Sequence, residues 1–351
     1  MQVASWTDPE SLLVGPRGRR LCRELLVGGG FLGPLRMEVR RGKAAGDPDR
    51  LARELAGTVR RTDLHALGAA AEPTAFLGAL GQTVSSAMYW QEPDETDAAL
   101  AGPLVRDALR PVAEAVASAP GVSWWTGPVA SEDQYQVVFP GQSEPEPPGD
   151  PHEALVRWRA ETVADEGAAL ERPADPTAAW SGRWWSTPAP SELPASTRTL
   201  GAPGSVGLSL VEDGADWTTA PCRLLRPRPG SSGFEVGSSE DWSKLVAHYP
   251  LLVPRSRRHD WHRTTGQDHL DWAIPDYLAV AEDYDAIHLS VAGYLTTSGR
   301  ALGTGESSTV LAGWDPDQTW WLTDNLQPPG SYSHCSTSAA YEPLRWRAGP
   351  P

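Results

Sequence analysis

The residues with the most chemistry lie between positions 255 and 288, which hold four of the chain's eight histidines. Arginines, aspartates and tryptophans are interleaved with them. Guanidinium groups bind phosphate, indole rings stack on a base, and histidine transfers protons, so this pattern is typical of an anion or nucleotide site. A salt-bridged surface loop has the same composition. The candidate ligand-binding residues here are Arg255, Arg258, His259, Trp261 and His262.

A second group of hydroxyl and basic side chains surrounds the W-S-T triplet. Ser186 and Thr187 follow Trp184-Trp185, and Arg198 comes a few residues later. At the end of a strand, these groups could hydrogen-bond a ribose or a phosphate. The alternative is a strand that Pro188 ends, with hydroxyls that only cap a turn.

Three shorter motifs are weaker. Residues 28–33 match G-x-G-x-x-G, but no strand-helix unit surrounds them, which favours a glycine connector. Asp315-Pro316-Asp317 could hold Mg²⁺, although proline at the second position is typical of a type I turn. A zinc site at His259 and His262 has no third ligand at supporting spacing. We therefore assign no metal site.

The segment from 180 to 322 resembles two groups of proteins. It contains RWWSTP at 183, GLSLVEDG at 207, FEVGSSEDWSKLVAHYP at 234, IPDYLAVAEDYDAIHLS at 274 and LAGWDPDQTWWL at 311. This run resembles uncharacterised proteins of high-GC Gram-positive bacteria and, distantly, ADP-ribosyltransferase-like domains. The second resemblance implies an NAD pocket supported by Ser186 and Thr187. No E-x-E or Q-x-E motif follows, so no catalytic residue is assigned.

Composition limits the classes of partner. The chain of 351 residues carries 30 Lys+Arg against 45 Asp+Glu, a net charge of −15, which disfavours nucleic acid because phosphates are bound by excess positive charge. No run of 18 apolar residues predicts a membrane span, and the first ten residues lack a signal-peptide pattern. The three widely spaced cysteines fit no disulfide framework. We therefore expect a cytoplasmic protein.

The distribution of helix and strand patterns predicts an α+β fold. We expect a mainly helical domain over 1–140, a Pro/Gly/acidic linker at 141–151, an α+β domain with a Trp-rich mixed or antiparallel sheet over 152–324, and an irregular tail from 325 to 351. Helices should begin at Pro9, Pro48 and Pro151, each preceded by aspartate. Ser238 and Asp241 predict a capped helix over 239–248. Proline should break or restart the helical run at 103 and 111.

In the second half, β-like segments are expected at 205–211, 221–226, 233–237, 285–291, 309–313 and 318–322. Side chains alternate along a strand, so one ring of Trp184-Trp185 and one of Trp320-Trp321 should face the core while the other faces away.

Two functional hypotheses follow. One is a nucleotide-binding enzyme or sensor, with NAD as the candidate cofactor, whose site lies between the W-S-T strand and the 255–272 loop. The other is a non-catalytic module that recognises a protein partner through an acidic, Trp-rich surface.

Overall fold

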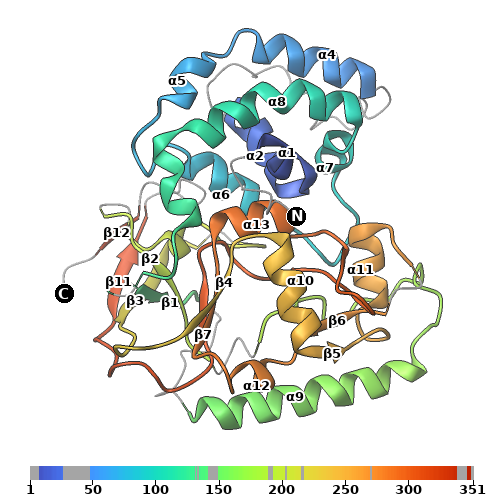
Figure 1. Cartoon of the computed structure of the whole chain (residues 1–351), viewed down its shortest axis with the longest axis vertical. Coiled ribbons are helices and arrows are strands. Elements are labelled where there is room, and N and C mark those ends of the chain that lie inside the picture. Colours follow the sequence, from blue (N-terminus) through green and yellow to red (C-terminus); the bar gives the residue numbers. More distant parts are fainter. Residues whose placement is uncertain are drawn as a thin grey trace.

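The computed structural model describes residues 8–26, 48–130, 132, 134–140, 149–188, 193–201, 204–214, 217–268, 271–337 and 346–348. The glycine motif at 28–33 and most of the predicted linker lie outside these residues. The α+β fold is confirmed: a helical layer stands over a mixed sheet, and further helices flank the sheet (Figure 1).

The helical layer is built from the described residues between 9 and 126. It contains α1 (Pro9–Val14), α2 (Pro16–Leu26), α4 (Pro48–Val59), α5 (Leu64–Gly68), α6 (Leu77–Ser85), α7 (Glu95–Leu100), α8 (Pro103–Ser118) and the 3₁₀ helix η2 (Pro120–Thr126). The helical run restarts at Pro103 as expected. Pro111, however, lies inside α8 without ending it. The buried side chains of Leu109, Val112 and Val116 hold this helix against its neighbours despite the missing N–H.

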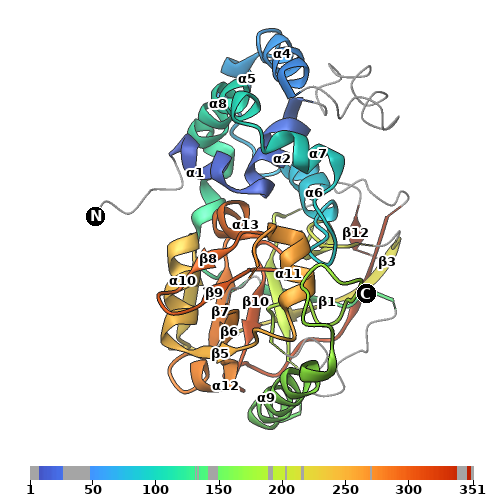
Figure 2. The same ribbon diagram turned by 90° about the vertical axis from the view of Figure 1, so that its right-hand side faces the viewer.

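The later helices surround the sheet. They are α9 (Pro151–Ala168), η3 (Ala169–Glu171), η4 (Val206–Leu208), α10 (Ser239–His248), α11 (Arg258–Thr265), α12 (Tyr277–Val280) and α13 (Val291–Thr297). Figure 2 shows α9 along the side of the sheet that is remote from the helical layer. The predicted cap of α10 is confirmed, because Ser238 Oγ accepts the N–H of Asp241 at 3.3 Å.

Eight strands form the main sheet in the order β12-β11-β3-β1-β2-β10-β7-β4. Their bounds are β1 (Gln134–Val137), β2 (Ala195–Arg198), β3 (Thr219–Leu225), β4 (Gly233–Val236), β7 (Ala286–Leu289), β10 (Thr319–Trp321), β11 (Ser333–Ser336) and β12 (Arg347–Ala348). Among the described strands of this sheet, only β4 and β7 pair in parallel. Two short antiparallel pairs accompany the sheet, β5 (Pro250–Leu252) with β6 (Ala273–Pro275) and β8 (Leu302–Gly303) with β9 (Ser308–Thr309).

Both sides of the predicted linker contribute to one core. Strand β1, which precedes the linker, pairs with β2 and β3, which follow it. One cluster of buried apolar side chains extends from Leu12 in α1 to Leu322 beyond β10. The tail beyond 325, which was expected to be irregular, also adds β11 and β12 to the sheet edge.

Helix α13 lies between the helical layer and the sheet (Figures 1 and 2). All seven of its residues are buried. A Cβ at Gly293 would lie 2.1 Å from the carbonyl oxygen of Val236, so only glycine allows α13 to approach the end of β4 this closely.

Three expected strands differ from the structure. Of the expected strand at 309–313, only Thr309 lies in a strand, β9. Residues 206–208 form the 3₁₀ helix η4, and residues 181–187, around the W-S-T triplet, form no strand. In this extended segment, Ser186 bonds to the backbone of Ala312 instead of to a neighbouring strand. The N–H and the hydroxyl of Ser186 both donate to the carbonyl of Ala312, and the N–H of Ala312 donates to Oγ of Ser186. The segment is thus fixed by the chain around 312, which is remote in sequence.

Candidate functional site

A cavity of about 590 Å³ lies beside β1, β2 and β10. Its walls come from three further stretches of chain: the W-S-T segment, the residues around 207–217 and the turn at 313–318. The volume is in the range of small-molecule sites. Its aromatic lining residues are Tyr135, Phe139, Trp184, Trp185, Trp217 and Trp320.

The aromatic walls are held by contacts among the rings. Trp184 packs against Trp185 at right angles, with ring centroids 5.8 Å apart, and against Trp90 at 4.9 Å. Trp217 stacks on Phe139 at 4.4 Å with an interplanar angle of 20°. These rings are therefore preorganised by one another, and little further ordering is needed when a ligand binds.

Two carboxyl groups line the same cavity. The backbone N–H of Glu212 donates to Oδ1 of Asp315 at 2.8 Å, and the N–H of Gly313 donates to Oε2 of Glu212 at 2.8 Å. Gly313 has φ of 73°, and a Cβ there would lie 2.7 Å from Cβ of Trp185. Glycine therefore permits both the turn and the contact with the Glu212 carboxylate.

Both carboxyls favour the protonated form. Burial, with the neighbouring Asp315, raises the pKa of Glu212 to about 8. Burial also raises the pKa of Asp315 to about 7, although the hydrogen bond from Glu212 N–H acts in the opposite direction. Oε1 of Glu212 and the nearby Tyr294 hydroxyl are buried, with no hydrogen-bond partner of good geometry among the described residues. Burial therefore shifts both carboxyls toward the uncharged form, although the charge of Arg17 lowers the pKa of Glu212.

The remaining polar lining is neutral or acidic. It consists of the hydroxyls of Thr187, Ser196 and Thr197, the amides of Gln136 and Gln318, and the exposed carboxylate of Asp213. No arginine, lysine or histidine occurs among the described residues that line this cavity. Arg17, which lies outside this lining, acts on Glu212 through its charge. The described lining itself thus combines π faces and carboxyl groups without a basic side chain.

The structure places the residues predicted around W-S-T in different surroundings. Thr187 lines the cavity. Ser186 is buried against Ala312 instead. Arg198 lies outside the cavity: its Nε donates to Oδ1 of Asp317 at 2.5 Å, and its Nη2 donates to the carbonyl of Pro128 at 3.0 Å.

None of the site residues predicted between 255 and 262 lines this cavity. The backbone N–H of Arg255 donates to Glu166, and Arg258 donates to the carbonyl of Ala169. His259 and His262 contact the carbonyls of Pro173 and Gln267 at 3.1 and 3.0 Å. The contacts of Arg255, Arg258 and His259 hold the start of α11 against the end of α9 and the residues after it, whereas His262 contacts the chain directly after α11. Trp261 alone reaches the W-S-T segment, since its Nε1 donates to the carbonyl of Trp184 at 2.7 Å.

Sequence reasoning did not identify Glu212 or Trp217 as site residues, and it considered Asp315 only as a turn residue or a Mg²⁺ ligand. The turn is present, but Asp317 has φ of 62°, which a type II turn requires and a type I turn does not. The only local signal for Glu212 is an acidic residue directly after the apolar run at 206–211. Its partner lies 103 residues further along the chain, so spacing could not reveal the pair.

A separate, buried network of charged side chains crosses the sheet. His288 on β7 is fully buried, and its Nδ1 lies 2.5 Å from Oε2 of Glu235 while its Nε2 lies 3.3 Å from Oδ1 of Asp317. Asp317 also receives the backbone N–H of Arg198 at 2.9 Å. Burial lowers the pKa of His288, but the hydrogen bonds to Asp317 and Glu235 outweigh it, and the pKa is raised. This network joins β2, β4 and β7, and we assign it a structural role.

The raised pKa of His288 predicts a pH-dependent stability. The folded-state pKa exceeds the unfolded value of about 6.5, so the stabilisation is complete below about pH 6.5 and is lost as the pH rises through the folded-state pKa. The quantity to measure is the difference in unfolding free energy between the parent and His288→Gln at each pH. Glu212 and Asp315 also make the stability depend on pH, but they are present in both proteins, so their contribution cancels in this difference. A difference that is constant or grows toward alkaline pH would contradict the assignment.

The described residues contain no group of three or more His, Cys, Asp or Glu side chains arranged to hold a metal ion. Within the same part of the chain, no helix has the length and apolar character needed to cross a membrane. No protein-family model matches the chain, and no curated protein or solved structure is significantly similar to it.

Proposed function

We propose that the cavity lined by Glu212, Asp315 and the tryptophans binds an organic cation, such as a primary or quaternary ammonium group. One observation carries this proposal: two carboxyls with raised pKa values face a tryptophan-lined cavity whose lining residues include no basic side chain. Perturbed carboxyls in a concave site are typical of functional positions.

The attraction has two components. A cation near Glu212 and Asp315 would favour their ionised forms and recover the cost of burying them. Indole faces attract the same cation through the ring quadrupole, and tryptophan is the strongest side chain for this interaction. The net charge of −15 attracts cations to the whole molecule. A free amine and the ammonium group of a lysine on a protein partner present the same chemistry.

Nucleotide binding, with NAD as the candidate cofactor, stays a prediction and is a competing outcome of the same experiment. A base or nicotinamide ring could stack on Trp184 or Trp185. The phosphates, however, would meet Glu212, Asp213 and Asp315 with no guanidinium group among the lining residues. We therefore expect NAD and ATP to bind this cavity weakly or not at all.

The test is a calorimetric titration with butylammonium, putrescine and choline, compared with neutral butanol, butyrate and NAD. We expect the cations to bind and the other probes not to bind. Affinity should increase as the pH rises through about 7 and about 8, because the carboxyls then lose their protons before binding. At pH 7, binding should release protons, so the measured heat should change between buffers of different ionisation enthalpy.

The decisive variant is Glu212→Gln, which we expect to weaken cation binding by about tenfold or more, equivalent to about 1.4 kcal/mol, and to reduce proton release. The matched control is Glu114→Gln, which removes the same charge from an exposed position on α8. Equal cation affinity in the parent and Glu212→Gln, or tighter binding of NAD than of any cation, would overturn the proposal.

A further inference from the structure

A second cavity, of about 600 Å³, lies on the helical side of α13. It is bounded by α2, by the stretch from Ser86 to Ala101 that includes α7, by the end of α11 and by the chain after α13. Its lining includes the arginines Arg17, Arg19 and Arg300. Unlike the tryptophan-lined cavity, it therefore contains basic groups.

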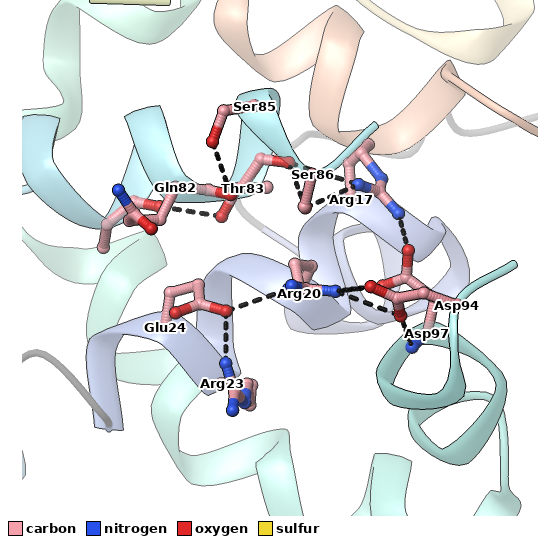
Figure 3. A network of polar contacts seen from close by, with 11 residues as sticks. Arg17, Arg20, Arg23, Glu24, Gln82, Thr83, Ser85, Ser86, Asp94 and Asp97 are labelled. Atoms are coloured by element: carbon pink, nitrogen blue, oxygen red, sulfur yellow. Dashed lines mark hydrogen bonds and ion pairs between the residues drawn. The ribbon is translucent and has the colours of Figure 1, made fainter. Parts of the chain in front are cut away.

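The aspartates of this cavity are already paired. Arg17 forms an ion pair with Asp97, and both side chains are almost fully buried. Arg20 donates to Asp94 at 2.9 Å and to Asp97 at 3.3 Å, and Figure 3 shows these contacts converging from α2 on the start of α7. Glu92, the remaining acidic lining residue, is exposed.

Arg19 and Arg300 differ from Arg17, because neither forms an ion pair with a described carboxylate. Arg19 donates through Nη1 to the carbonyls of Leu13 and Val14 at 2.9 and 2.8 Å, and Arg300 donates through Nη1 to the carbonyl of Thr296 at 2.6 Å. Each guanidinium has five N–H donors, so most of them remain available. Nε of Arg19 is buried without a partner among the described residues.

Positive charges gather around Arg19. Burial lowers the pKa of Arg19 to about 10, and the charges of Arg106, Arg17 and Arg300 contribute in the same direction, whereas Asp97 acts in the opposite direction. Burial likewise lowers the pKa of Arg300. An anion between them would remove this excess positive charge and accept the unused N–H groups.

We propose that this cavity binds a phosphate group between Arg19 and Arg300. Phosphate fits because its oxygens accept the paired donors of two guanidinium forks and its double charge balances both. The cavity is larger than inorganic phosphate, so its chemical class of ligand is a phosphate monoester. The proposed cation site lies in a different cavity, and the two are linked only through charge, because Arg17 lowers the pKa of Glu212.

The proposal is tested by titrating the full chain with inorganic phosphate, phenyl phosphate and acetate at constant ionic strength set by chloride. We expect saturable binding of the two phosphates, with acetate weaker. Arg300→Gln should weaken phosphate binding by about tenfold or more. Arg19→Lys keeps the charge but loses the fork, so it should produce a smaller loss.

The matched control is Arg110→Gln, which removes an arginine that pairs with Glu10 outside the cavity. It should bind phosphate as the parent does, and thermal melts should confirm that every variant is folded. The proposal is overturned if no phosphate binds at millimolar concentration, if Arg300→Gln and Arg19→Lys both bind like the parent, or if acetate binds as tightly as phosphate.

Discussion

Replacing Asp317 by alanine is expected to lower the free energy of unfolding by about 3–5 kcal/mol. Asp317 is 1% exposed and accepts both the Nε of Arg198, at 2.5 Å, and the backbone N–H of Arg198, at 2.9 Å. It also contacts the buried ring of His288. Its loss would leave a largely buried guanidinium without its carboxylate, and this uncompensated charge is the main source of the cost.

The measurement is chemical denaturation of three variants. Asp317→Asn keeps a residue that tolerates positive φ and removes only the charge, so it should destabilise less than Asp317→Ala. Asp213→Ala is the matched control: this aspartate also has positive φ, 50°, but it is exposed. If Asp213→Ala and Asp317→Ala cost the same, the backbone conformation and not the ion pair would explain the effect.

Replacing Trp321 by alanine should cost about 3–5 kcal/mol, and Trp320→Ala should fall in the same range. The side chains alternate across β10 as expected from sequence, but both rings are buried, at 1% and 5% exposure. Trp321 packs with Leu225 and Ala286, and its Nε1 donates to Ser196 Oγ at 2.8 Å. Trp320 faces the main core and the cation cavity.

Denaturant melts of the four single tryptophan variants test this arrangement. Trp184 and Trp185 are each partly exposed, so Trp184→Ala and Trp185→Ala should cost less stability than Trp320→Ala or Trp321→Ala. Trp185→Ala should also weaken binding of the cationic probes. A mild loss of stability in Trp321→Ala would contradict the burial of both faces of β10.

The sequence by itself determined features that depend on a few neighbouring residues. The helix beginning at Pro151 is capped by Asp150, whose Oδ1 accepts the N–H of His152 at 2.9 Å. The helix over 239–248 begins where its capping pattern predicted and spans the expected residues. Strands near 221–226, 233–237, 285–291 and 318–322 were also located, because short apolar runs bounded by turn residues favour strands. The α+β class follows from these elements.

The tertiary structure alone decided which side chains meet. The pairing of Glu212 with Asp315 depends on backbone contacts that fold residues 212 and 313 together, and no local pattern encodes them. The arginines and histidines at 255–262 had the composition of an anion site, yet the end of α9 and the residues after it provide their partners. Likewise, alternation along β10 gave the direction of each tryptophan but not what covers each face. Local hydrogen bonds and sterics determine secondary structure, whereas burial, and with it the pKa of a carboxyl, depends on residues distant in the chain.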